Sequence, residues 1–227
     1  MVELNQIILA DCMDIMKDIP DKWFELAITD PPYGIGMASG LDGVYSNSNR
    51  GKTFTKGVKR FKEAEWDNNP PNNDYFNELI RISKNQIIWG GNYFTNKLPV
   101  SRGWIFWDKK ITNSTSPNFS DGELAWTSFD KILKRFVYDW IGFGYLNNPA
   151  GEKKIHPTQK PIALYRWLLQ NYAKTGDKII DTHSGSGSLA CACHLENFDF
   201  LAIEKDEDYH KSSVERLETL RSQGRLF

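Results

Sequence analysis

The chain has 227 residues, of which 40% are hydrophobic and 25% are charged, and its formal net charge is −1. This length and composition predict one globular domain over residues 1–227, with a core of ordinary size. The balanced charge excludes a globally basic nucleic-acid-binding surface, although a local basic patch remains compatible with it.

Targeting and redox features are equally plain. The first residues show neither the basic segment nor the apolar stretch of a signal peptide, and no apolar run reaches the ~18 residues that span a bilayer. The three cysteines (Cys12, Cys191 and Cys193) form an odd set without a second ligand pair at zinc spacing. We therefore expect a cytoplasmic protein with reduced, buried thiols, no metal and no membrane segment.

Apolar runs alternate with helical patterns along the chain. The expected strands cover 6–11, 24–30, 85–91, 103–109 and 122–129, and two more end at Asp181 and Glu204. The expected helices cover 12–19, 74–83 and 162–173, with one after the glycine-rich turn at 184–187 and one at the carboxyl end. Polar loops occupy 34–73 and 110–121, and 134–161 is predicted to be irregular. This order favours a doubly wound, mostly parallel α/β sheet flanked by helices.

In such a sheet, ligands bind beyond the carboxyl ends of the strands. Three candidate positions follow expected strands: Asp11, the segment 30–33, and the segment 181–187. The turn "DTHSGSGS" (181–188) opens a helix, and Glu204 ends the next strand. Glycines let a ligand approach the backbone, and a carboxylate at Glu204 can accept hydrogen bonds from both hydroxyls of a ribose. The pattern favours a nucleoside-containing cofactor, while an ordinary turn followed by a solvated Glu remains the alternative.

The stretch "DPPY" (Asp30, Pro31, Pro32 and Tyr33) is the most specific signal in the sequence. Neither proline has a backbone N–H, so the strand end offers two acceptors, the Asp30 carboxylate and the Pro31 carbonyl. Two adjacent acceptors suit an amino group with two hydrogens, and the tyrosine ring offers a stacking face. The residues predict a pocket for the exocyclic amine of adenine or cytosine.

With these motifs, the chain resembles the S-adenosylmethionine-dependent DNA amino-methyltransferases that modify adenine N6 or cytosine N4. Their (D/N/S)-P-P-(Y/F/W) motif matches residues 30–33, and their cofactor turn resembles residues 181–188. Since the catalytic motif precedes the cofactor turn, the order resembles the circularly permuted β group. The resemblance implies catalytic roles for Asp30, Pro31, Pro32 and Tyr33, and it implies S-adenosylmethionine as the cofactor. It also implies cofactor contacts from Asp11, Thr158, Gln159, Lys160, Asp181, His183, Gly185, Ser186, Gly187, Ser188 and Glu204.

Two histidines lie in or beside these motifs. His183 stands where family members often have Phe, and we expect it to pack there or to touch the methionine part of the cofactor. His156 opens "HPTQKP", and we expect it to position neighbours rather than to carry a proton.

A basic cluster follows the catalytic motif and consists of Arg50, Lys52, Lys56, Lys59, Arg60 and Lys62. A solvated face is the plain interpretation, but beside a base-binding pocket phosphate contacts are favoured. We expect segments 34–73 and 134–155 to contact double-stranded DNA. The resemblance is also compatible with a homodimer and with a cognate restriction endonuclease as a partner. The protein would act in the cytoplasm of a bacterium, or, if a phage encodes it, in the cytoplasm of the phage's host.

Asp at the first motif position favours adenine N6 over cytosine N4 in the resembling family. Three other interpretations stay open at this point. The same acceptors would bind an RNA base or a protein glutamine amide, and an inactive nucleic-acid-binding module would keep the fold. A dehydrogenase is disfavoured, because the acid–proline pair has no role there.

Overall fold

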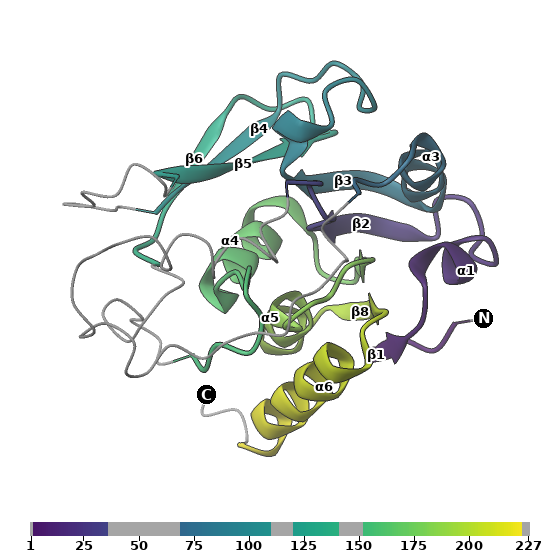
Figure 1. The fold of residues 1–227 in the computed structure, drawn as a ribbon, viewed down its shortest axis with the longest axis vertical. Coiled ribbons are helices and arrows are strands. Elements are labelled where there is room, and N and C mark those ends of the chain that lie inside the picture. The colour runs from purple at the N-terminus through teal and green to yellow at the C-terminus, as the bar shows by residue number, and fades with distance from the viewer. Residues whose placement is uncertain (1, 36–68, 110–119, 141–151, 224–227) are drawn as a thin grey trace, which may run out of the picture.

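The computed structural model describes residues 2–35, 69–109, 120–140 and 152–223. Its centre is an eight-stranded sheet with the strand order β1-β8-β7-β2-β3-β5-β4-β6 (Figure 1). The strands are β1 (Gln6–Leu9), β2 (Phe24–Thr29), β3 (Ser83–Trp89), β4 (Trp104–Asp108), β5 (Gly122–Thr127), β6 (Lys134–Val137), β7 (Lys178–Asp181) and β8 (Asp199–Glu204). Of these strands, β5 alone runs antiparallel to its neighbours, β3 and β4. The prediction of a mostly parallel α/β sheet is therefore confirmed.

Helices cover both faces of the sheet, as Figure 1 shows. On one side lie α4 (Ile162–Tyr172), α5 (Ser188–Glu196) and α6 (Glu207–Ser222), and on the other α1 (Cys12–Met16) and α3 (Asn73–Ile82). Two buried clusters correspond to these faces. One joins Leu164 and Leu168 of α4 to the sheet, and the other does the same with Phe76 and Leu79 of α3.

Helix α3 shows how the sequence forms these elements. Its side chains Tyr75, Phe76, Leu79 and Ile82 are buried, as a period of three to four residues requires. The Asn72 side chain caps its first turn by accepting a hydrogen bond from the Tyr75 amide at 3.1 Å. The chain turns extended directly afterwards at Ser83, which begins β3. Strand β3 thus enters the sheet beside β2, with Leu26 opposite Asn85.

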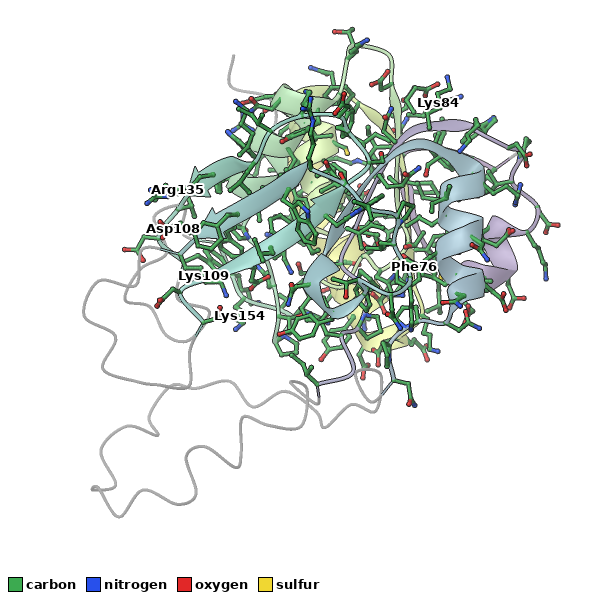
Figure 2. All side chains as sticks on the ribbon, turned by 90° about the horizontal axis from the view of Figure 1, so that it is seen from above. Phe76, Lys84, Asp108, Lys109, Arg135 and Lys154 are labelled. Atoms are coloured by element: carbon green, nitrogen blue, oxygen red, sulfur yellow. The ribbon has the colours of Figure 1, made fainter. Side chains whose placement is uncertain are left out.

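The sequence prediction was wrong at 134–137, where irregular structure was expected and β6 is found. This strand pairs with β4 at the edge of the sheet, and Arg135 forms an ion pair with Asp108 of β4 (Figure 2). An edge strand with exposed Lys134 and Arg135 lacks the apolar run that marks a central strand. Its pairing comes from tertiary contact, which explains why the local pattern did not predict it.

Candidate active site

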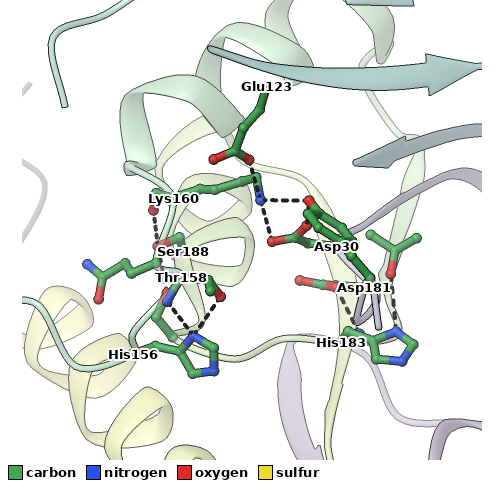
Figure 3. Close-up of polar contacts among 12 residues, drawn as sticks. Asp30, Glu123, His156, Thr158, Lys160, Asp181, His183 and Ser188 are labelled. Atoms are coloured by element: carbon green, nitrogen blue, oxygen red, sulfur yellow. Dashed lines mark hydrogen bonds and ion pairs between the residues drawn. The ribbon is translucent and has the colours of Figure 1, made fainter. Parts of the chain in front are cut away.

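The carboxyl ends of the parallel strands β1, β2, β7 and β8 bring four acids to one edge of the sheet. Asp11 follows β1, Asp30 follows β2, Asp181 ends β7 and Glu204 ends β8. The sequence placed each of these acids at a strand end, and the sheet brings them together. Figure 3 shows Asp30 and Asp181 beside each other, between residues of the segment 156–160 and His183.

Tyr33 turns back toward Asp30 within the "DPPY" segment. Its hydroxyl donates a hydrogen bond to Asp30 Oδ1 at 2.5 Å. One face of the ring stacks on Tyr93, with the ring centroids 5.0 Å apart and the planes 17° apart. Phe94 meets the Tyr33 ring edge-on at 6.1 Å. Burial, with the nearby Asp30 carboxylate, holds the pKa of Tyr33 well above its ordinary value, so the hydroxyl remains a donor.

Lys160 occupies the centre of this part of the site. Its ammonium donates to Asp30 Oδ2, and it lies 3.0 Å from Glu123 Oε2 of β5 and 3.4 Å from the Tyr33 hydroxyl (Figure 3). Lys109 pairs with the other oxygen of Glu123 at 2.6 Å. The side chain of Lys160 is 3% exposed, while those of Asp30, Lys109 and Glu123 are 17%, 19% and 25% exposed, so the lysine is the buried centre of a partly buried cluster of two acids and two lysines. The family resemblance implies that Lys160 contacts the cofactor, whereas its ammonium contacts the catalytic motif.

Burial and charge act against each other in this cluster. Burial raises the pKa of Asp30, and the Lys160 ammonium opposes that shift. Burial also acts to raise the pKa of Glu123, but Lys160 and Lys109 outweigh it and lower that pKa to about 2. Although burial disfavours the charge on Lys160, the carboxylates of Asp30 and Glu123 raise its pKa. Lys160 is therefore a cation, and Glu123 is an anion.

The glycine-rich turn is fixed by Glu204 and by a nearby segment. Glu204 Oε2 accepts from the Gly185 amide at 2.7 Å, and Oε1 accepts from the Asp206 amide at 2.9 Å. Ser188 Oγ donates to the Lys160 carbonyl at 2.8 Å, and Ser186 Oγ lies 3.0 Å from Ser188 Oγ. The backbone of Lys160 thus contacts the start of α5, while its side chain points to Asp30.

Asp181 is the last residue of β7, directly before this turn, and its side chain is buried. Its Oδ1 accepts from the His183 amide at 3.1 Å. Burial raises the pKa of Asp181 to about 8, and the nearby carboxylates of Asp30 and Glu204 add to the shift. Among the described residues, neither Asp181 nor Glu204 forms an ion pair.

His156 and His183 each lie beside a threonine hydroxyl and pack edge-on against a tyrosine ring. His156 Nδ1 lies 3.2 Å from Thr158 Oγ1, and its ring packs edge-on against Tyr209 at 4.3 Å. Burial lowers the pKa of His156 to about 3, so the ring is neutral. His183 Nδ1 lies 3.1 Å from Thr182 Oγ1 and its ring meets Tyr75 edge-on, and burial lowers its pKa to about 4. The expectation that His156 positions neighbours rather than carrying a proton in catalysis remains a prediction.

Other predicted site residues have structural contacts of their own. Asp11 caps α1 by accepting from the Met13 amide at 2.9 Å. Gln159 Oε1 accepts from the Ile155 amide at 2.9 Å, and its carbonyl accepts from Trp140 Nε1 at 3.0 Å. Roles in cofactor binding remain predictions for both.

The predicted DNA contacts fall largely outside the described residues. The basic cluster at 50–62 lies there entirely, as do most of the segment 34–73 and the middle of 134–155. Of the second segment, 134–137 forms β6, and Lys154 lies with Lys109 at one end of the molecule (Figure 2). Burial lowers the pKa of Lys154 to about 8, with a smaller contribution from Lys109.

Four residues of the site were missed by sequence reasoning. They are Glu123, Lys109, Tyr93 and Gly90, the last of which lies so close to the Tyr33 ring that a Cβ on it would come within 2.1 Å of Cε1. Glu123 stands in an apolar strand and resembles a solvent-facing residue of an alternating pattern. The one local signal was "WGGNY" at 89–93, where two glycines end a strand before an aromatic residue.

Comparisons with known proteins agree on one class. The sequence profile of the N6/N4 methyltransferase family, described as DNA methylase, matches residues 24–215. A Type II methyltransferase of Moraxella bovis, M2.MboI, is 25% identical over 249 residues, covering 91% of this chain and 85% of the relative. M.HpaI of Haemophilus parainfluenzae is 24% identical over 251 residues, covering 95% and 74%.

Solved structures show the same fold. The M1.HpyAVI–SAM complex superposes with a TM-score of 0.57 at 24% identity, covering 93% of this chain and 98% of that one. The cytosine-N4-specific PvuII DNA methyltransferase superposes with a TM-score of 0.56 at 12% identity, covering 96% and 91%.

The fold and the profile together define a DNA methyltransferase of the amino-methylating class. The chain belongs to the N6/N4 DNA methylase family. In the described residues, no helix is long and apolar enough to cross a membrane.

Proposed function

We propose that this protein transfers a methyl group from S-adenosylmethionine to the exocyclic N6 amine of adenine in double-stranded DNA. The observation that carries the proposal is the place of Asp30. It directly follows β2, which pairs with β7, and the glycine-rich turn after β7 is the candidate cofactor site. The reacting amine and the methyl donor would therefore meet at adjacent strand ends.

The residues around the turn suit this cofactor. Gly185 has φ +51°, a conformation that glycine adopts readily, and a Cβ on it would make only an ordinary contact with the His156 ring at 3.5 Å. Asp181 and Glu204 supply carboxylates, which accept hydrogen bonds from hydroxyl and ammonium groups. S-adenosylmethionine carries both kinds of group, and when bound it supplies an electrophilic methyl group. The M1.HpyAVI relative was solved as a complex with SAM, which supports the same cofactor here.

Asp30 and Pro31 act on the amine. An exocyclic nitrogen is a weak nucleophile because its lone pair is delocalised into the ring. Hydrogen bonds from its two hydrogens to the Asp30 carboxylate and the Pro31 carbonyl would draw it toward tetrahedral geometry and localise the lone pair. This is preorganised electrostatics and positioning. The base must leave the duplex to reach this point, and the Tyr33 ring would offset part of that cost by stacking.

Adenine is favoured over cytosine because the first motif residue is Asp30, as the family resemblance implies. DNA contacts from the basic cluster at 50–62, a homodimer, a cognate endonuclease and a cytoplasmic location remain predictions. An inactive binding module is the alternative that the experiment below tests directly, because such a module would leave the DNA unmethylated.

The test is methylation of duplex DNA of mixed sequence, followed by nucleoside mass spectrometry. We expect N6-methyladenine from the wild-type protein. Asp30→Ala should lower the rate by more than ~10²-fold, the usual cost of a transition-state hydrogen-bond partner, while calorimetry shows unchanged cofactor binding. Asp14→Ala, an acid with a 72% exposed side chain on α1, is the matched control and should keep full activity. N4-methylcytosine as the product would reject the adenine assignment. Full activity of Asp30→Ala would reject the role of Asp30.

A further inference from the structure

Lys160 joins two parts of the molecule that are far apart in the sequence. Its ammonium contacts Asp30 after β2 and lies 3.0 Å from Glu123 on the antiparallel strand β5. The rings of Trp89 and Tyr33 lie 5.4 Å and 5.9 Å from the same nitrogen, which encloses it further. The remaining Glu123 oxygen is held by Lys109 at 2.6 Å.

We propose that Lys160 is a positioning residue for Asp30, which it keeps ionised and oriented, and that Glu123, braced by Lys109, holds the Lys160 ammonium in place. The proposal rests on the proposed function, because it assigns Asp30 the amine of the target base. It gives Lys160 a role at Asp30 in place of the cofactor, and it adds Glu123 of β5 and Lys109, which follows β4, to the residues that support catalysis.

The carboxylate needs such a partner because of what surrounds it. Tyr33 and Lys160 contact Asp30, whereas Glu123, Asp181 and Tyr165 act on it at longer range. Burial and the Glu123 carboxylate both favour the protonated form of Asp30. A protonated carboxyl would present its own hydrogen to the amine on one side. The Lys160 cation opposes protonation and preserves both acceptors.

Lys160 still leaves room for the substrate. An ionised carboxylate has about four lone-pair positions. The Tyr33 hydroxyl takes one on Oδ1 and Lys160 takes one on Oδ2, so a lone pair on either oxygen remains for the incoming amine. Lys160 itself is no candidate for a general base, because an ammonium has donors only and its pKa is raised.

A purely structural ion pair is the competing explanation. Buried ion pairs are weak contributors to stability, because the desolvation cost offsets the attraction. A stability role would lower the melting temperature of a variant and leave the pH dependence of its chemistry unchanged. The pH profile therefore separates the two roles.

The experiment measures single-turnover methyl transfer from pH 5 to pH 9 for Lys160→Met, Lys160→Arg and Glu123→Gln. An opposite charge at this range moves a carboxyl pKa by ~1–3 units. We expect Lys160→Met to lower the rate at least ~10-fold and to move the acid limb upward by ~1 unit or more. Lys160→Arg should return the limb toward the wild-type position. Arg166→Met, which removes an ion pair between α4 and α5, is the control and should match the wild type.

The Glu123→Gln variant separates a positioning role from a purely electrostatic one, because the two roles predict different reaction rates. Removing this negative charge lowers the pKa of Asp30, so electrostatics alone would move the acid limb downward and spare the rate. If Glu123 holds Lys160, the rate falls across the whole pH range while the limb does not rise. A wild-type pH profile for Lys160→Met, or a full rate for Glu123→Gln, would overturn the proposal.

Carbon-13 NMR of aspartate carboxyls gives a readout independent of turnover, with Asp30→Asn to assign the signal. We expect Asp30 to be ionised at pH 7 in the wild-type protein, and a protonated Asp30 would overturn the proposal even if Lys160→Met does not fold. A wild-type protein that methylates no DNA but shows an ionised Asp30 would reject the proposed function and leave the contact with Lys160 supported.

Discussion

Gly90 lies directly against the Tyr33 ring, and replacing the glycine gives a sharp test of the site. The residue follows β3 with φ +67°, a conformation that side chains other than glycine rarely adopt. A Cβ on Gly90 would lie 2.1 Å from Cε1 and 2.5 Å from Cζ of Tyr33. Carbon atoms do not approach that closely, so Gly90→Ala must displace the ring or the end of β3.

The cost of Gly90→Ala has two parts that a control can separate. The left-handed conformation costs a non-glycine residue ~1–2 kcal/mol. Gly176 has φ +88°, and a Cβ on it would meet no atom of the described residues within 4 Å, so Gly176→Ala carries this strain alone. In a domain of this size ~1 kcal/mol lowers the melting temperature by ~2–4 °C, which gives a fall of ~2–8 °C for Gly176→Ala. Gly90→Ala should fall further.

The activity of the two variants should differ more than their stability. Displacing a substrate-contacting group by ~1 Å can cost ~10²-fold in rate, so Gly90→Ala should lose about that factor while Gly176→Ala loses none. Single-turnover methylation and thermal unfolding measure both effects. In a Tyr33→Ala background the three ring atoms nearest to the new Cβ are gone, and Gly90→Ala should then cost much less stability than it does with Tyr33 present. Equal melting temperatures and full activity for Gly90→Ala in the wild-type background would refute the reasoning.

Two further predictions concern single side chains. Tyr33→Ala should lose far more activity than Tyr33→Phe, because the ring supplies the stacking face and the hydroxyl only one hydrogen bond to Asp30; equal losses would count against stacking. His156 has its pKa lowered to about 3, against ~6.5 in the unfolded chain, so the native state stays neutral while the unfolded state gains a proton. Its contribution to stability is therefore full above pH ~6.5 and is lost as the pH falls toward 3. Urea unfolding should show a smaller fall over this window for His156→Gln, and an unchanged slope would contradict the assignment.

The sequence was sufficient to predict which acids lie at the carboxyl ends of the parallel strands. Asp30, Asp181 and Glu204 each end an apolar run, and the rule for parallel strands places such residues at one edge. The acid–proline–proline–tyrosine motif added the prediction that an exocyclic amine binds at Asp30. These features are local, so neighbouring residues along the chain were sufficient to identify them.

Glu123 and the side-chain direction of Lys160 could not be predicted in this way. Glu123 reaches the site because β5 enters the sheet antiparallel between β3 and β4, a pairing fixed by tertiary contacts. Lys160 has four side-chain carbons and could have faced the cofactor turn, which its carbonyl does contact through Ser188. Two partly buried carboxylates, one directly after β2 and one on β5, determine its direction instead, and no spacing along the chain encodes that.

The charges of the site fall into two groups that suit two different reactants. Around Asp30, the two carboxylates and two lysines balance, and a neutral amine is the ligand that such an environment accommodates. Around the turn, Asp181 and Glu204 form no ion pair within the described residues, and burial raises the pKa of both. A ligand that carries positive charge would favour their ionised forms by linkage, and S-adenosylmethionine is such a ligand. On the proposed function, the same sheet edge would offer the base a charge-balanced environment at Asp30 and the cofactor an acidic one at the turn. Among the described residues the Lys160 ammonium forms its ion pairs with Asp30 and Glu123, and it acts on Asp181 only at longer range.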